Sequence, residues 1–362
     1  MIKRILPVVL LLALVLTSTA QTVAEVPPKP PVITVNVGGF AIARYTYTSN
    51  ADPSNYLSMR SVRLGVSGRL VDEFEYKAQF KLEGKSTNVN GPQLLDAYVE
   101  WQRFKAFRVK IGQFKRAFTF ENPTHPIDQG FYGYSMAINK LSGQNDRVGE
   151  PLCTGRDLGL QFQGDLLEMD GRPLLHYQIG IYNGQGINMA DLNNKKDIIG
   201  GFWVMPAQGL RIGASGWNGT YGRTYEGQYA EVKRVRYALS GEYVALDWVF
   251  RAEYVHSNGA AFKNPYGGNL DLDETLGDEA DAWYALMIAP LIPETLHAKI
   301  RYDVYRDSAS WDRMYSAYDL GMDWIIAKHL KISAIGSYVN DRRIAQGSHN
   351  YFMFDLQTSI RF

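Results

Sequence analysis

The last twelve residues of the chain, 351–362, alternate between two kinds of side chain. Because successive residues of a β-strand point to opposite faces, this alternation predicts a strand with one largely apolar face and one polar face. The first face carries Phe352, Phe354, Leu356, Thr358, Ile360 and Phe362, and the second carries Met353, Asp355, Gln357, Ser359 and Arg361. Such a strand fits either a soluble sheet with one wet face or a membrane barrel, so the fold class depends on whether the pattern recurs.

The alternation recurs along most of the chain, most clearly at residues 74–85. There Phe74, Tyr76, Ala78, Phe80 and Leu82 oppose Glu75, Lys77, Gln79, Lys81 and Glu83. We predict about sixteen strands, joined by turns that are alternately short and long, with loops at 218–231 and 258–279. This arrangement is typical of an all-β transmembrane antiparallel barrel, which is the predicted fold class. A barrel of this size encloses an aqueous lumen, so the polar faces are expected to meet water.

The first 32 residues predict two segments that precede the barrel. Residues 1–20 contain Lys3 and Arg4, then a short apolar run, then small residues up to Ala20, as in a cleaved secretory signal peptide. Residues 21–32 are rich in proline and predict a stiff periplasmic linker. Residues 33–362 are then the barrel domain. After residue 20 there is no stretch of eighteen consecutive apolar residues, so no transmembrane helix is expected.

Composition excludes several classes of function. The formal net charge of +1 argues against nucleic-acid binding, whose proteins usually carry a basic excess. The single cysteine, Cys153, excludes an internal disulfide framework. The six histidines have no zinc-motif spacing, and the acidic loop 258–279 lacks the spacing of an EF-hand. No metal and no cofactor are therefore expected.

Residues 116–155 interrupt the strand rhythm for about forty residues, with a short helix predicted at 135–141. Connections of this length within a compact domain are uncommon and usually functional. The interruption contains Arg116 and Arg147, and it is flanked by Lys110, Lys115 and Arg156. It is therefore the first place to look for a functional site.

The segments LLDAYVEW (94–101), VKIGQFKRAF (109–118) with Glu121, and GRDLG (155–159) resemble the phosphate-selective porin O and P family. The resemblance is sharp over residues 60–165 and the closing strand. It implies a trimeric, sixteen-stranded outer-membrane channel with a long third loop folded into the lumen, for which residues 116–155 lie in the matching place. The terminal Phe362 resembles the C-terminal signature of outer-membrane barrels, which implies contact with the barrel-assembly machinery. Outer-membrane lipid and lipopolysaccharide are the other expected partners.

The chain departs from this family in two respects. Ala117 and Thr119 stand where the family usually has proline and glycine. The basic residues of the polar strand faces are also roughly balanced by acidic ones, whereas anion-selective members have a basic excess. The resemblance therefore supports the family's fold more strongly than it supports the family's preference for anions such as phosphate.

Two sets of residues are candidates for the pore. The predicted constriction and anion-binding residues are Lys110, Lys115, Arg116, Arg147 and Arg156. The predicted pore-lining residues are Arg63, Lys77, Lys81, Arg108, Glu100, Lys299 and Arg301. Arginine forks and lysine charges can bind phosphate or carboxylate groups. The alternative is that these cations pair with Glu100, Glu121, Asp146 and Asp157, which would give a weakly selective pore.

The predicted function is passive diffusion of small hydrophilic solutes, including anions such as phosphate, through an outer-membrane porin. A second hypothesis is a structural or adhesive barrel plugged by its long loop. A third is a barrel hydrolase that uses His256 with Asp247 or Glu253, or His297 with Asp303. Because no nucleophile motif accompanies these pairs, we do not expect an enzyme.

Overall fold

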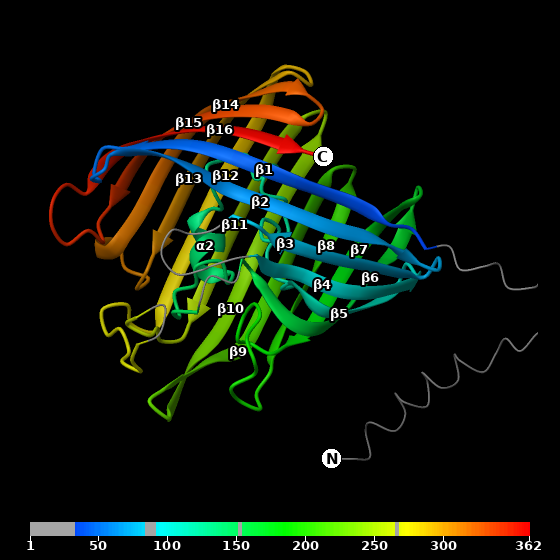
Figure 1. Ribbon diagram of the computed structural model, residues 1–362, viewed down its shortest axis with the longest axis horizontal. Helices are drawn as coiled ribbons and strands as arrows, with labels where there is room; N and C mark the ends of the chain where they lie inside the picture. Colours follow the sequence, from blue (N-terminus) through cyan, green and yellow to red (C-terminus); the bar gives the residue numbers. More distant parts are fainter. Residues whose placement is uncertain (1–32, 84–91, 151–153, 265–267) are drawn as a thin grey trace, which may run out of the picture. The chain divides into compact units, whose positions relative to one another are not determined.

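The computed structural model describes residues 33–83, 92–150, 154–264 and 268–362. In this part of the chain, sixteen antiparallel strands form one closed barrel, and each strand pairs with its neighbours in sequence (Figure 1). The barrel closes where β1 (Asn36–Thr48) pairs with β16 (Asn350–Arg361). The predicted fold class and strand number are confirmed. The predicted signal peptide and linker lie outside the described residues. Within the described residues we found no helix long and apolar enough to cross a membrane.

The other strands and helices follow in chain order. They are β2 (Asn55–Leu70), β3 (Phe74–Lys81), β4 (Gln93–Phe104), β5 (Phe107–Lys115), α2 (Met136–Leu141), β6 (Arg156–Met169), β7 (Arg172–Tyr182), β8 (Asp197–Ala207), β9 (Leu210–Tyr225), β10 (Gln228–Ala245), β11 (Trp248–Asn258), β12 (Glu279–Ile292), β13 (Leu296–Arg306), the 3-10 helix η2 (Trp311–Arg313), β14 (Met314–Ala327) and β15 (Leu330–Asp341).

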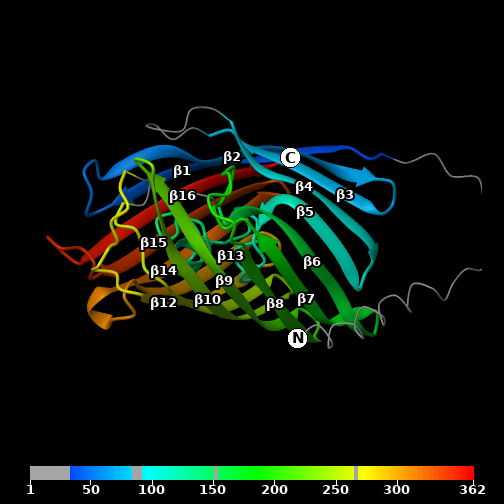
Figure 2. The same ribbon diagram turned by 90° about the horizontal axis from the view of Figure 1, so that it is seen from below.

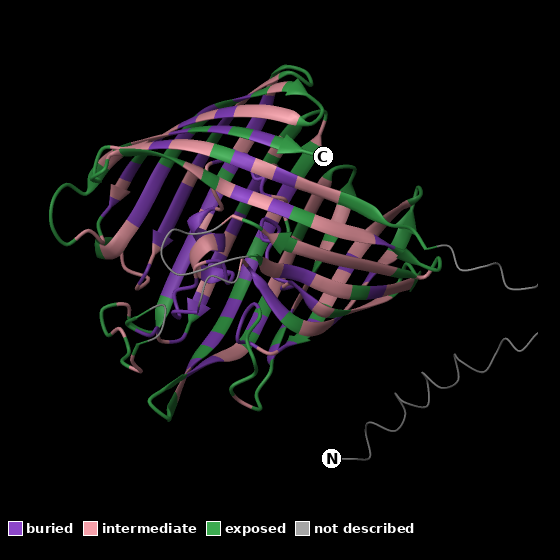
Figure 3. Ribbon diagram, viewed as in Figure 1, coloured by how far each residue is buried: buried purple, intermediate pink, exposed green. Residues whose placement is uncertain are grey.

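The side-chain alternation runs opposite to that of a soluble sheet. On β16, the apolar Phe352 and Ile360 are each 46% exposed, whereas the acidic Asp355 is only 3% exposed. Figure 3 shows the same alternation of exposed and buried positions along many strands. Apolar side chains thus cover the outside of the barrel and polar side chains fill its inside, which is the pattern of a barrel surrounded by lipid.

The two ends of the barrel differ in the length of their connections. One end carries both termini of the barrel and short turns such as 105–106, 170–171 and 246–247. The opposite end carries long connections, including 116–155 and 259–278. In outer-membrane barrels the short turns are periplasmic and the long connections extracellular, and we name the two ends accordingly.

The predicted loop at 218–231 is wrong. Strands β9 and β10 instead continue as a paired hairpin up to a tight turn at Glu226 and Gly227, whose φ angles are 49° and 78°. Tyr221 pairs with Val232, and both pack inside the barrel against Phe262. This contact keeps the strands paired through a segment whose polar composition suggests a loop.

Residue Arg60 forms a β-bulge in β2. Ile42 pairs with Ser61, and the next residue, Ala43, pairs with Met59, so Arg60 has no partner in β1. A bulge of one residue redirects side chains relative to the regular alternation. Here Arg60 contacts residues inside the barrel.

The connection between β5 and β6 lies inside the barrel (Figures 1 and 2). Its helix α2, which confirms the helix predicted at 135–141, contacts β11, β12 and β13. Phe118, Phe131 and Leu141 of the connection pack with Trp217 and Tyr284 of the wall. On this side the lumen is a packed interior, so the expectation that all polar strand faces meet water is wrong.

Candidate functional site

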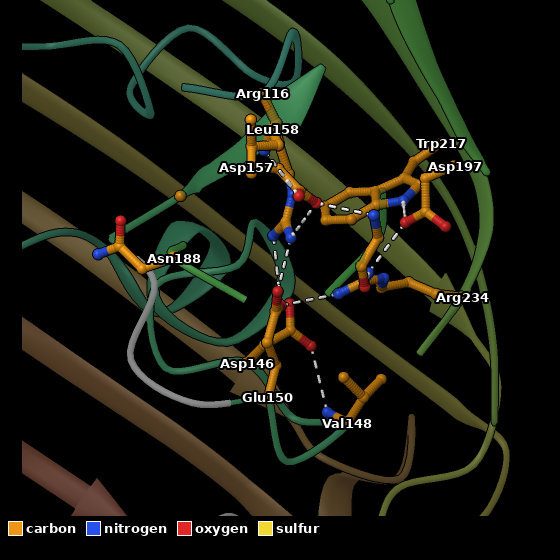
Figure 4. Close-up of polar contacts among 12 residues, drawn as sticks. Arg116, Asp146, Val148, Glu150, Asp157, Leu158, Asn188, Asp197, Trp217 and Arg234 are labelled. Carbon is orange, nitrogen blue, oxygen red and sulfur yellow. Dashed lines mark hydrogen bonds and ion pairs between the residues drawn. The ribbon is translucent and has the colours of Figure 1, made fainter. Parts of the chain in front are cut away.

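The two ends of the β5–β6 connection are held by a buried cluster of charged residues (Figure 4). An Nη atom of Arg116 lies 2.5 Å from Glu150 and 2.8 Å from Asp157. Arg234 of β10 donates to Glu150 at 2.7 Å and to Asp197 at 2.9 Å. All five side chains are almost completely buried. Glu150 therefore joins an arginine near the start of the connection to an arginine of β10 in the barrel wall.

The indole ring of Trp217 forms the centre of this cluster. The guanidinium carbons of Arg116, Arg234 and Arg236 lie 4.8, 4.4 and 4.9 Å from its centroid. Its Nε1 donates to Asp197 at 2.7 Å. Arginines gathered around one aromatic face gain cation–π attraction, which is strongest where water is excluded.

A second ion pair, between Asp146 and Arg236, holds the extracellular part of the connection. Nη2 of Arg236 donates to Oδ1 of Asp146 at 2.6 Å. Burial by itself raises the pKa of Asp146, but the Arg236 guanidinium lowers it more strongly, so the pKa falls to about 2. The pair is therefore fully charged at neutral pH.

The middle of the connection is attached through its backbone. Arg60 donates to the carbonyl of Phe131 at 3.3 Å, and Arg301 donates to the carbonyl of Gly133 at 3.0 Å. The amide of Met136 donates to Asp303 at 2.9 Å. These contacts satisfy backbone groups that would otherwise be buried without partners. They come from β2 and β13, which are five strands apart around the barrel.

The segment 123–130 reaches the periplasmic part of the lumen. Arg361 of β16 lies 2.8 Å from Asp128, and Lys331 of β15 donates to the carbonyl of Ile127 at 2.8 Å. His125 packs edge-on against Phe40, with ring centroids 4.4 Å apart. Burial and the neighbouring Arg361 lower the pKa of His125 to about 4, so its ring is neutral at neutral pH.

Between this connection and the wall formed by β2 to β7 there is a cavity of ≈ 290 Å³. Its basic lining residues are Arg63, Lys77, Lys110, Lys115, Arg116 and Arg156. Among the described lining residues, Asp96 is the only carboxylate. Tyr98, Phe114 and several glutamines complete the lining. We call this space the basic cavity.

The ion pairs around the basic cavity compensate only part of its positive charge. Asp96 accepts from Arg156 at 2.6 Å and lies 3.1 Å from Lys77. Arg63 is only 8% exposed, and it forms no ion pair within the described residues. Lys115 donates to neutral oxygens of the connection, including the hydroxyl of Tyr134 at 2.8 Å. Arg63 and Lys115 therefore leave the cavity with a positive potential.

The structure brings four of the five predicted constriction residues to the basic cavity. These are Lys110, Lys115, Arg116 and Arg156. Arg147 is elsewhere, because it is buried at the extracellular side of the connection. It donates to the backbone carbonyls of Gly259, Leu276, Gly277 and Asp307. Arg147 thus ties the connection to extracellular loops.

The predicted pore-lining residues all lie on the inner face but in different surroundings. Arg63 and Lys77 line the basic cavity. Lys81 lies 3.7 Å from Glu83, and Arg108 lies 2.9 Å from Asp165. The β5–β6 connection covers Lys299 and Arg301, which pair with Asp323 and Asp319.

The expected neutralising pairs are present only in part. Glu100 lies 3.1 Å from Lys110, and Asp157 lies 2.8 Å from Arg116. Asp146 instead pairs with Arg236. Glu121 accepts from the hydroxyl of Ser135 at 2.6 Å, and burial raises its pKa.

The histidine–carboxylate pairs considered for a hydrolase are not assembled. His256 stacks on the exposed Tyr237 on the outer face, whereas Glu253 is buried on the inner face. Asp303 binds the amide of Met136, and His297 lies 3.8 Å from Asp247. In the described ranges there is also no group of three His, Cys, Asp or Glu residues that could hold a metal ion. Cys153 lies outside these ranges.

Sequence reasoning did not select several residues that organise the site. Strand alternation could not place Arg60 inside, because that position follows from the bulge. Glu150 and Asp197 lie in or beside loops, where alternation gives no orientation. Trp217 is inward-facing, but it is the last residue before the segment that was mistaken for a loop.

Comparison with known proteins supports the fold and part of the sequence resemblance. The family model of phosphate-selective porin O and P matches residues 34–164, which confirms the resemblance over this part. No match was found among curated protein sequences.

Solved outer-membrane proteins have the same barrel fold. The anion-selective porin from Comamonas acidovorans is 13% identical with a TM-score of 0.64, covering 91% of this chain and 100% of that chain. The outer membrane channel DcaP of Acinetobacter baumannii is 12% identical with a TM-score of 0.61, covering 91% and 97%. OmpT of Vibrio cholerae in its trimer form is 14% identical with a TM-score of 0.59, covering 91% and 99%.

Proposed function

We propose that this protein is an outer-membrane channel through which small hydrophilic solutes diffuse passively, and that its basic cavity favours anions. The family match, the sixteen-strand barrel and the porin structures that share its fold support the channel. The observation that carries the preference for anions is the basic cavity, where six cations face one lining carboxylate.

The mechanism is electrostatic attraction in a narrow, partly desolvated passage. The β5–β6 connection fills the side of the lumen next to β9–β13, which leaves the solute the side next to β2–β7. There Arg63 and Lys115 attract an anion, because a charge near a low-dielectric wall acts more strongly than in bulk water. Asp96 and Glu100 compensate neighbouring cations, so the anion is held weakly enough to leave.

Three further features belong to the same proposal. We expect export through cleavage after Ala20, assembly through the C-terminal strand that ends at Phe362, and a homotrimer. OmpT in its trimer form supports the last point only through its shared fold. The mass of the mature protein and its migration before and after heating would test cleavage and assembly.

Conductance in a planar bilayer tests the channel and its selectivity together. Across a salt gradient we expect discrete steps and a reversal potential that favours anions. In the double variant Arg63→Gln/Lys115→Gln the anion preference should fall about tenfold, because each lost charge near the pore is worth about 1 kcal/mol or less. The matched control is Lys328→Gln, which removes an exposed charge in a periplasmic turn. Equal selectivity in all three proteins would contradict the role of the basic cavity.

Added phosphate distinguishes the solutes. A reduced chloride current in the presence of phosphate would support phosphate as a solute that binds at the basic cavity. The second candidate, a plugged structural barrel, is favoured by the packed contacts of Phe118, Phe131 and Leu141 inside the lumen. Folded, heat-modifiable protein that gives no conductance steps would support this candidate and contradict the channel.

A further inference from the structure

The outer surface of the barrel has an open groove of ≈ 630 Å³ across β7, β8, β9 and β10. Its outward-facing lining includes Tyr177, Ile179, Ile198, Phe202, Gly216 and Val235. The groove lies on the face that the membrane surrounds. It is separate from the basic cavity.

Two glycines on neighbouring strands form the floor of the groove. Ile179 pairs with Gly200, Gly200 pairs with Gly216, and Gly216 pairs with Tyr237. At Gly216 the nearest atom to an added Cβ would be 4.0 Å away, so the space above it is open. At Gly200 an added Cβ would lie 2.5 Å from the carbonyl oxygen of Gln178, so glycine lets β7 and β8 approach closely. The walls are large apolar side chains, and the groove is therefore shaped for a chain of methylene groups.

A positive charge stands at the extracellular end of the groove. Lys233 precedes Val235 by two residues on β10, points outward and is exposed. Neither Lys233 nor the neighbouring outward-facing Asn218 has a side-chain hydrogen bond or an ion pair in the ranges that the structure describes. Both side chains are therefore available to a ligand.

The position of Lys233 along the strand places it at the edge of the membrane. Ten residues separate it from Tyr243 near the periplasmic end of β10. At about 3.4 Å per residue and a tilt of about 45°, they span about 24 Å, close to the height of the apolar band of an outer-membrane barrel. Lys233 therefore lies at the level of the headgroups of the outer leaflet.

We propose that this groove binds lipid A, with one saturated acyl chain over Gly216 and a phosphate group beside Lys233 and Asn218. The inference rests on the outer-membrane location proposed above. Apolar walls match the acyl chain, and the lysine matches the phosphate of the outer-leaflet glycolipid. A neighbouring subunit would bury a broad surface, whereas the lining of this groove is confined to β7, β8, β9 and β10.

Native mass spectrometry of the detergent-purified full-length protein, titrated with lipid A, tests the proposal. Gly216→Phe fills the groove and should weaken binding about tenfold, because it displaces roughly two buried methylene groups. Lys233→Gln should weaken the binding of lipid A about fivefold. Removing the phosphates from lipid A should weaken its binding to wild type by the same factor, because both changes remove the same contact. The matched controls are Gly241→Phe, at another open outward glycine of β10, and Lys328→Gln. Neither control should change the affinity.

The outcomes separate the groove from the channel. Unchanged lipid A affinity in both Gly216→Phe and Lys233→Gln would overturn the proposal, even if wild type conducts normally. Dissociation of an oligomer by Gly216→Phe without loss of lipid A would assign the groove to a second copy of the chain and also overturn it. Heat-modifiable migration shows whether Gly216→Phe folds. If it does not fold, Lys233→Gln and dephosphorylated lipid A still test whether the groove binds lipid A. Conductance is measured on the same preparations, so that failure of the proposed channel is recognised separately.

Discussion

At the scale of single residues, Glu150 has the largest expected effect on the β5–β6 connection. Its two oxygens accept from Arg116 and Arg234 in a site closed to solvent. Glu150→Gln removes the shared negative charge and leaves two buried guanidinium groups undercompensated. Breaking a buried pair in this way costs about 3–5 kcal/mol, here in the free energy that docks the connection to the wall. Hydrogen exchange of residues 134–150 should accelerate strongly.

The matched control for this prediction is Glu168→Gln. Glu168 lies 3.6 Å from Lys105, but its side chain is 57% exposed, and such pairs contribute little to stability. Exchange in residues 134–150 should be unchanged in the control. Equal protection in Glu150→Gln and wild type would show that the connection is held without the buried pair.

Residue-scale prediction from sequence succeeded where the alternation is regular. Lys110 was correctly predicted to face the lumen, because it lies within a well-formed strand next to a short turn. Arg60 was missed because one extra residue in β2 changes which side chains face the lumen. Hydrogen-bonded partners such as Glu150 and Arg234 are 84 positions apart, and no local pattern connects them.

At the scale of elements, the β5–β6 connection has one strong attachment and one weak one. Its extracellular part is held by buried pairs, whereas Asp128 and Arg361 at the periplasmic part are 54% and 43% exposed. Exposed pairs are screened by salt, since the Debye length falls to about 3 Å at 1 M. We therefore expect 1 M salt to accelerate proteolysis within residues 123–130 but not within 134–150. In Asp128→Asn, cleavage within residues 123–130 should already be fast at low salt. If 1 M salt still accelerates cleavage in this variant, the Asp128–Arg361 pair is not the salt-sensitive attachment.

Acid should release the extracellular part of the connection. The pKa of Asp146 is about 2 in the folded protein, compared with its usual 3.8, because Arg236 outweighs the opposing effect of burial. A lowered pKa stabilises the docked state above the usual pKa, and this contribution is lost as pH falls through the folded value. Between about pH 4 and pH 2 the loss amounts to about 2 kcal/mol. Protease protection of residues 134–150 should decrease over this range.

The variant Asp146→Asn isolates this contribution. It lacks the titrating carboxylate, so its connection should be less protected at neutral pH and should lose less protection on acidification. If wild type and Asp146→Asn show the same decrease between pH 4 and pH 2, other groups control the acid response.

The elements also show why strands were easier to predict than connections. Membrane strands need an apolar outer face and a lumen-facing polar one, so their signal is present in each short segment. The β9–β10 hairpin was mistaken for a loop because its stability comes from Tyr221, Val232 and Phe262, which meet only in the folded barrel. The helix α2 was found because Ser135 is an N-cap signal that acts locally.

At the scale of the whole molecule, the sequence predicted the barrel but not how its interior is divided. Counting charges on the polar strand faces gave a rough balance, which suggested a weakly selective lumen. The structure instead separates these charges: the connection buries and pairs many of them on one side and leaves the basic cavity on the other. Net charge is a sum over the whole lumen, whereas selectivity depends on the few charges beside the remaining passage.

Removing the β5–β6 connection tests this division of the interior. The backbone amide of Arg116 donates to the carbonyl of Gly155 at 2.9 Å, so a short glycine–serine turn can replace residues 117–154 without straining the barrel. Arg116 keeps Asp157, and Arg234 keeps Asp197, so the exposed lumen retains paired charges. A barrel of sixteen strands is wide enough for a continuous aqueous channel.

We expect this shortened protein to conduct several times more current than wild type and to lose most of its anion preference, because the passage no longer follows the β2–β7 wall. The measurements are single-channel conductance and reversal potential, with heat-modifiable migration as the control for folding. Steps in the shortened protein together with none in wild type would show that the connection is a plug. Equal conductance in wild type and the shortened protein would mean that the connection does not limit the current through the lumen.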